Sequence, residues 1–191
     1  MIFQILFLTV LISGLAHAGT IADYQKWHEQ CQNATDTATI DQIIERYQRC
    51  LDADPNDQLA KVYLGSAHTL RSAETFWGPK KLEYLKKGGA LMDEAVDAAP
   101  NDPRVRFIRA VNAYKVPKHF KRRPVALSDF ATLLPIAELG GHGLTKRERQ
   151  VILFYAWKTF SEEAQLAKAA QAKQSCHTLD PTSWYGQETA K

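Results

Sequence analysis

The chain has 191 residues, with 24 lysine and arginine side chains, 21 aspartate and glutamate side chains and a formal net charge of +3 at pH 7. This length allows one domain with a real core, and charges of both signs are mixed along the sequence, so nucleic-acid binding is not expected. Ala, Leu, Glu, Lys and Arg are frequent and no long alternation of β-branched residues occurs. We therefore predict an all-α protein.

The first 18 residues are predicted to be a signal peptide. Residues 2–15 are almost continuously apolar, and Ala16-His17-Ala18 is a small-x-small motif that a signal peptidase could cut before Gly19. The apolar run is shorter than the roughly 20 residues of a membrane span. Because no Lys or Arg follows Met1, an uncleaved membrane anchor is the alternative. Cleavage would leave residues 19–191 as a single exported domain, periplasmic or secreted.

Export would place the three cysteines in an oxidising compartment. An odd number allows at most one internal disulfide among Cys31, Cys50 and Cys176. Cys31 and Cys50 are expected on the two arms of a helical hairpin that turns near Asp36, and antiparallel pairing would keep them farther apart than a disulfide can span. Buried free thiols are therefore favoured over a Cys31–Cys50 bridge.

Apolar periodicity predicts four helices in the first half of the exported chain. They are expected over residues 21–32, over a segment capped by Asp36 or Thr39 that ends near Ala53, over about 59–73, and over about 81–98. The last of these contains Gly88-Gly89, and each glycine inside a helix costs about 1 kcal/mol relative to alanine. We therefore expect a neighbouring helix to approach closely there.

The second half of the chain is predicted to hold four more helices. The fifth helix follows Asp102 and ends at Val116-Pro117, and the sixth covers 125–134 and ends at Pro135. The seventh begins after Thr145, and the eighth runs to about Thr178. Thr145 and Glu148 have the spacing of a capping box. The tail after Pro181 is expected to begin another helix or to pack loosely.

One phrase occurs twice in the sequence. Asp54-Pro55-Asn56-Asp57 returns 45 residues later as Ala99-Pro100-Asn101-Asp102, and each copy opens an amphipathic helix. A small residue, Gly65 or Ala110, follows eight positions after the last aspartate, and a weaker copy begins at Leu179. A turn that recurs at a nearly fixed period is typical of a helical repeat array.

Together with Tyr63, these positions resemble the tetratricopeptide-repeat family. The resemblance is good over 51–114 and loose elsewhere, and the spacing of 45 residues exceeds the family's unit of 34. It implies antiparallel helix pairs stacked as a right-handed superhelix whose concave surface binds peptides or partner domains. We therefore expect a TPR-like adaptor or scaffold for a protein or peptide partner, in a cell-envelope assembly.

Basic and polar side chains supply the candidate partner-binding residues. Three of them share one face of the fifth predicted helix, opposite the stripe of Val105, Ile108 and Val111. The resemblance implies that this helix, and the equivalent helix before it, line the groove. The candidates are Arg106, Arg109 and Asn112, with Lys61, His68 and Arg71 on the earlier helix. Arginines in a groove can hold a carboxylate or an acidic segment, and a solvated helix face is the alternative.

The most basic stretch of the chain is residues 118–123. It contains Phe120 among Lys, His and Arg residues. Such a segment could touch anionic lipid at a membrane surface. An ordinary charged loop is the alternative.

No catalytic motif is present, so we expect neither an enzyme nor a bound cofactor. His28 with Cys31, and Cys176 with His177, could form a tetrahedral metal site only if the first and last helices met. The alternative function is a small-molecule or metal carrier with a pocket between the central helices, near Trp77 and His119. The sequence sets neither the partner nor the oligomeric state.

Overall fold

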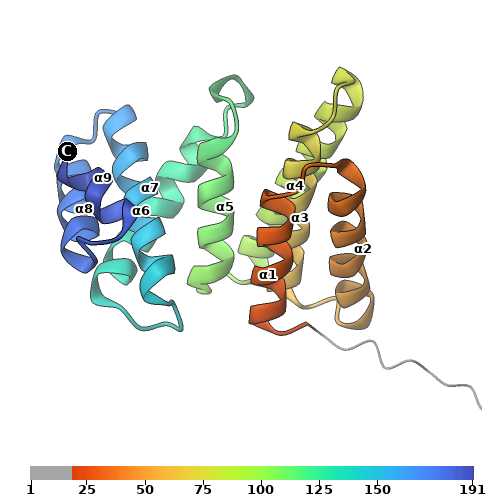
Figure 1. The fold of residues 1–191 in the computed structure, drawn as a ribbon, viewed down its shortest axis with the longest axis horizontal. Helices are drawn as coiled ribbons and strands as arrows, with labels where there is room; N and C mark the ends of the chain where they lie inside the picture. The colour runs from red at the N-terminus through yellow and green to blue at the C-terminus, as the bar shows by residue number, and fades with distance from the viewer. Residues whose placement is uncertain (1–18) are drawn as a thin grey trace, which may run out of the picture.

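The computed structural model describes residues 19–191, and the predicted signal peptide lies outside them. The described chain is built from α-helices and one short 3-10 helix, without strands (Figure 1). The all-α prediction is thus confirmed. None of these helices is both long and apolar enough to cross a membrane. The elements are α1 (Ile21–Gln32), α2 (Thr37–Ala53), α3 (Gln58–Ala73), α4 (Gly78–Ala98), α5 (Pro103–Lys115), η1 (Lys118–Phe120), α6 (Arg123–Leu139), α7 (Lys146–Glu162), α8 (Leu166–Leu179) and α9 (Trp184–Ala190).

Side-chain caps set several of the predicted helix starts. Asp36 accepts from the backbone N–H of Thr39 at 2.7 Å at the start of α2, and Asp57 and Asp102 cap α3 and α5 in the same way. Thr145 and Glu148 form the predicted capping box of α7. Each cap supplies an acceptor for an N–H that the first turn of a helix leaves unpaired.

The sixth helix is longer than the sequence analysis predicts. It extends from Arg123 to Leu139, and Pro135 lies inside it instead of ending it. Pro135 and Ala131 are both exposed, so water can take the place of the backbone hydrogen bond that proline removes. The helix ends at Gly140, which has a φ of 80°.

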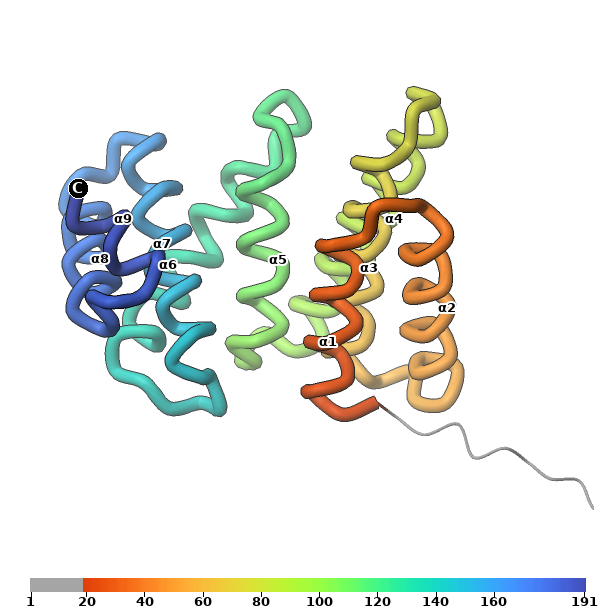
Figure 2. The backbone as a smooth tube through the Cα atoms, in the orientation of Figure 1, coloured from red at the N-terminus to blue at the C-terminus, as the bar shows by residue number. Residues whose placement is uncertain are grey.

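The helices pack against one another in sequence order (Figure 2). Contacts join α1 to α2, α3 to α4, α5 to α6 and α7 to α8, and further contacts join α1 to α3, α3 to α5 and α5 to α7. The view runs from α2 at the right to α8 and α9 at the left. Helices 1, 3, 5 and 7 therefore form one continuous row, an arrangement compatible with a helical repeat.

The helices α3 and α4 cross at two glycines. A Cβ added to Gly88 would lie 2.5 Å from the backbone oxygen of Gly65, and a Cβ added to Gly65 would lie 2.7 Å from that of Gly88. The expected close approach is confirmed at Gly88. It does not extend to Gly89, where an added Cβ would meet no atom within 4 Å.

The three cysteines are free and buried. Burial raises the pKa of the Cys31 thiol to about 12 and that of Cys176 to about 11. Both thiols are therefore protonated at neutral pH and poorly reactive.

Candidate functional site

A partly open groove of about 520 Å³ lies along the row of helices 1, 3, 5 and 7. Its lining combines apolar and aromatic side chains with polar and charged ones in similar number. The aromatic side chains come from four helices, α3, α5, α7 and α9: Tyr63, Phe107, Tyr155 and Tyr185. A concave surface of this size with both apolar and polar groups can serve as a binding site.

Three basic side chains reach the groove from different helices. They are Lys26 of α1, Lys115 of α5 and Arg147 at the start of α7. Within residues 19–191 none of the three forms an ion pair, whereas the arginines of α5 do. The carboxylates that line the groove are Glu29 and Glu148, and Glu148 is neutralised as described below. The groove therefore carries a positive excess.

Two ionisable side chains of the groove, His28 and Lys115, have shifted pKa values. Burial, followed by the nearby charge of Lys115, lowers the pKa of His28 to about 4, so the ring is neutral at pH 7. The Nδ1 atom of His28 is buried without a hydrogen-bond partner in the described chain. Burial also lowers the pKa of Lys115, whose Nζ lies 5.6 Å from the ring centre of Tyr155. Lys115 is exposed, so its ammonium group is accessible to an incoming anion.

Glu148 holds three helices together at one end of the groove. It accepts from Nε of Arg104 at 2.8 Å, from Gln25 at 3.0 Å and from the backbone N–H of Thr145 at 2.7 Å. Although burial alone would raise the pKa of Glu148, the bonds from Arg104 and Thr145 hold it below its usual value. Glu148 is therefore an ionised structural clamp.

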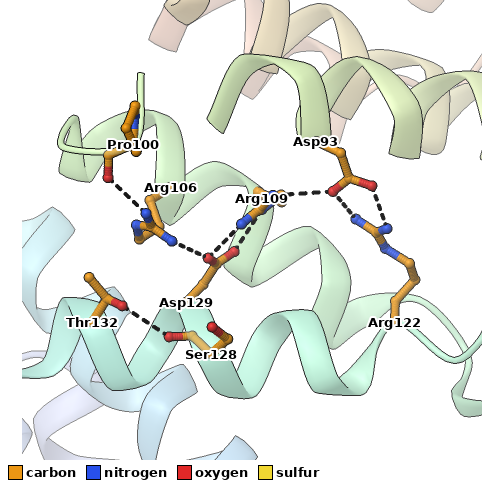
Figure 3. Close-up of polar contacts among 8 residues, drawn as sticks. All are labelled: Asp93, Pro100, Arg106, Arg109, Arg122, Ser128, Asp129 and Thr132. Atoms are coloured by element: carbon orange, nitrogen blue, oxygen red, sulfur yellow. Dashed lines mark hydrogen bonds and ion pairs between the residues drawn. The ribbon is translucent and has the colours of Figure 1, made fainter. Parts of the chain in front are cut away.

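Two of the predicted partner-binding residues, Arg106 and Arg109, do not line the groove, and their guanidinium groups are paired inside the fold. Figure 3 shows both of them directed at the carboxylate of Asp129 on α6. Arg106 Nη1 lies 2.7 Å from Asp129 Oδ1, and Arg109 Nε lies 2.8 Å from Oδ2. Arg109 also reaches Asp93 at 3.3 Å.

A buried charge explains this orientation. Asp129 is fully buried, and a buried carboxylate requires cationic or hydrogen-bonding partners. The face of α5 that meets the groove instead carries Ile108 and Val111, which belong to the apolar stripe that the sequence analysis places opposite the candidate arginines. A lone aspartate in the apolar segment of α6 was the available signal, because a charge in such a segment needs a partner from a neighbouring helix.

The remaining candidates on α3 are also largely engaged inside the fold. His68 is buried and stacks on Tyr84, and burial lowers its pKa to about 4. Arg71 donates to Asp41 at 2.7 Å. Lys61 is partly exposed and lines neither the groove nor the second cavity.

Asn112 is the one predicted residue that lines the groove. Its Nδ2 donates to Oγ1 of Thr69 at 2.5 Å, which joins α5 to α3. Asn112 also borders a second cavity behind it. It therefore forms part of the partition between the two.

This second cavity has a volume of about 360 Å³, lies between α3, α4, α5 and η1, and is as open to solvent as the groove. It matches the expected region between the central helices. Neither Trp77 nor His119 lines it, and both side chains are exposed. The apolar ring that does border it from the basic loop is that of Phe120.

Internal ion pairs occupy much of the basic stretch at residues 118–123. Lys118 and Arg123 both pair with Glu162 at 3.2 Å, and Arg122 pairs with Asp93 at 2.7 Å. The positive charge of the loop is thus used largely within the fold.

Metal-ligating side chains do not gather in the described part of the chain: it holds no group of three or more His, Cys, Asp or Glu residues arranged to bind an ion. The sequence matches no protein-family model, no curated protein and no solved structure.

Proposed function

We propose that this protein is a TPR-like adaptor that binds a protein or peptide segment in the groove between helices 1, 3, 5 and 7. The observation that carries the proposal is the groove itself, which crosses four helices and combines aromatic walls with unpaired basic side chains. A segment of extended chain can lie along such a surface and contact each helix in turn. The action of the protein would be binding without a catalytic step.

The order of helix contacts supports the TPR-like part of the proposal. The first helix of each antiparallel pair contacts the first helix of the next pair, and these helices share the groove. A superhelix of stacked pairs has this property, because each pair is rotated slightly relative to the one before it. The two Pro-Asn-Asp turns join α2 to α3 and α4 to α5, between pairs.

The charges of the groove define the partner segment. Lys26, Lys115 and Arg147 favour carboxylate groups, and the aromatic side chains between them favour apolar ones. The partner segment would therefore alternate acidic and apolar side chains. With the predicted signal peptide, the place of action would be the periplasm or the exterior of the cell, in an envelope assembly.

A pair of double charge reversals tests the proposal. The groove variant carries Lys115→Glu and Arg147→Glu, and the matched control carries Lys81→Glu and Lys168→Glu, which change exposed lysines outside the groove. Both are crosslinked in cell envelopes beside the unmodified protein, and bound partners are identified by mass spectrometry. We expect one dominant partner with an acidic segment that the control retains and the groove variant loses.

A synthetic peptide of that acidic segment then measures affinity directly. The groove variant should bind it at least about tenfold more weakly, since two charge-assisted contacts are replaced by repulsion. Equal binding by the groove variant and the control would refute the proposed binding surface. Circular dichroism of each variant verifies that the helices are intact.

A further inference from the structure

Gly89 borders the second cavity, and helix packing does not require a glycine at this position. Gly88 is needed where α4 crosses α3, but an added Cβ on Gly89 would meet open space. A glycine inside a helix costs about 1 kcal/mol relative to alanine, so a residue with a side chain would be the better choice if this space were only a packing defect.

The walls of the cavity are mainly apolar. They come from one face of α4, from the end of α5 and from η1, and they include Leu82, Leu85, Met92, Val116 and Phe120. The volume of about 360 Å³ lies within the range of small-molecule sites. Leu82 is 37% exposed at the rim, so the cavity is reached from solvent along an apolar edge.

Only one charge on this lining is left without a partner in the described chain. Asp93 accepts from Nη1 and Nη2 of Arg122 at 2.7 Å each, so these two residues neutralise each other. Thr69 donates to the backbone oxygen of Ser66. Lys86, which also borders the cavity, forms no ion pair with any residue of 19–191, and the ion pairs of α4 use Lys80, Glu83 and Asp93.

We propose that the second cavity binds the free carboxylate form of a single-chain fatty acid, with the acyl chain against Gly89 and the apolar wall and the carboxylate at Lys86. An apolar slot with one unpaired cation at its edge is complementary to a ligand with an apolar body and one negative charge. The site is separate from the groove, since Gly89 and Lys86 do not line the groove. A test of this site therefore does not decide whether the protein is an adaptor.

Calorimetric titration of residues 19–191 with dodecanoate, below its micellar concentration, tests the site. Gly89→Leu places a side chain in the cavity while favouring the helix, so it should abolish saturable binding without lowering the melting temperature. Lys86→Glu should weaken binding by about tenfold or more, because a charge-assisted contact is lost. Lys87→Glu is the matched control, since it makes the same change one residue away and outside the lining; it should change the affinity less than about twofold.

Two further probes distinguish the source of the ligand. Dodecanol, which lacks the charge, should bind more weakly than dodecanoate and be indifferent to Lys86→Glu. Phosphatidylglycerol vesicles should bind no better to the unmodified protein than to Gly89→Leu. The proposal is overturned if dodecanoate does not bind saturably, if Gly89→Leu and Lys86→Glu bind it as the unmodified protein does, or if only vesicles bind.

Discussion

Arg109 donates to both oxygens of the fully buried carboxylate of Asp129, at 2.8 Å each. This bidentate pair fixes α5 against α6 in one rotational setting. Because Arg109 also contacts Asp93, the same side chain links α4 to the pair. The arginine that the sequence analysis assigns to partner binding thus orients the helix so that its other face meets the groove.

Replacing Asp129 should destabilise the fold strongly. Asp129→Asn leaves Arg106 and Arg109 without their buried counter-charge, and removal of one member of a buried ion pair costs about 3 kcal/mol or more. Asp93→Asn is the matched control; its carboxylate is 38% exposed, so we expect a loss of about 1 kcal/mol or less. Urea denaturation measures both, and equal losses would contradict the central role of Asp129.

The two adjacent glycines of α4 should respond in opposite directions to alanine. Gly88→Ala forces a Cβ into the backbone of α3 and should lower the free energy of unfolding by about 1–3 kcal/mol. Gly89→Ala meets no neighbour and should raise it by about 1 kcal/mol. Thermal melts followed by circular dichroism check the pair, and a stabilised Gly88→Ala would contradict the close helix crossing.

The stability of the fold should fall in mild acid because His68 is buried in its neutral form. Its folded pKa is about 4, against about 6.5 for an unperturbed histidine. Between these values the unfolded chain binds the proton and the folded chain does not, so the free energy of unfolding falls as the pH drops from 6.5 to 4. The loss should be about 3 kcal/mol from this residue.

A histidine variant separates this contribution from the rest. His68→Gln should flatten the pH dependence of the free energy of unfolding over that window. His28 should add to the same slope, because its pKa is also lowered to about 4. Urea denaturation at a series of pH values measures the slopes; a curve for His68→Gln that coincides with the unmodified protein would contradict the assignment.

Glu148 should contribute to stability in two separable ways. Glu148→Gln keeps a side chain that suits a capping box but loses the charge facing Arg104, and should cost about 3 kcal/mol. Glu148→Ala loses the cap as well, and should cost about 1 kcal/mol more. The comparison requires denaturation curves of both variants. Identical midpoints would contradict a contribution from the cap.

The sequence predicts the local features of this fold better than the pairing between helices. The aspartate and threonine caps are readable because each acts within three residues of itself. The prediction that the sixth helix ends at Pro135 fails. Whether proline ends a helix depends on the exposure of the backbone around it, and the local sequence does not specify this exposure. The close crossing at Gly88 could be expected from the cost of a glycine pair, but nothing local distinguishes Gly88 from Gly89.

The sequence predicts a groove along stacked helices, but it does not identify most of the residues that line this groove. Helical periodicity allows two opposite faces of α5, and the choice between them depends on Asp129, 20 residues from Arg109 along the chain. Lys115 and Arg147 carry no local signal that separates them from ordinary surface cations. The packing of α5 against α6 decides that Arg106 and Arg109 are paired inside the fold.

The hydrogen bond between Gln25 and Glu148 joins positions 123 residues apart, from α1 to α7. Most other contacts in the row are between helices close in sequence. A row held only by such local contacts would be flexible along its length, because small changes between neighbouring helix pairs add up. The bond from α1 to α7, which continues through Glu148 to Arg104 on α5, instead fixes the width of the groove at one end. Bending of the row is therefore confined to the opposite end of the groove.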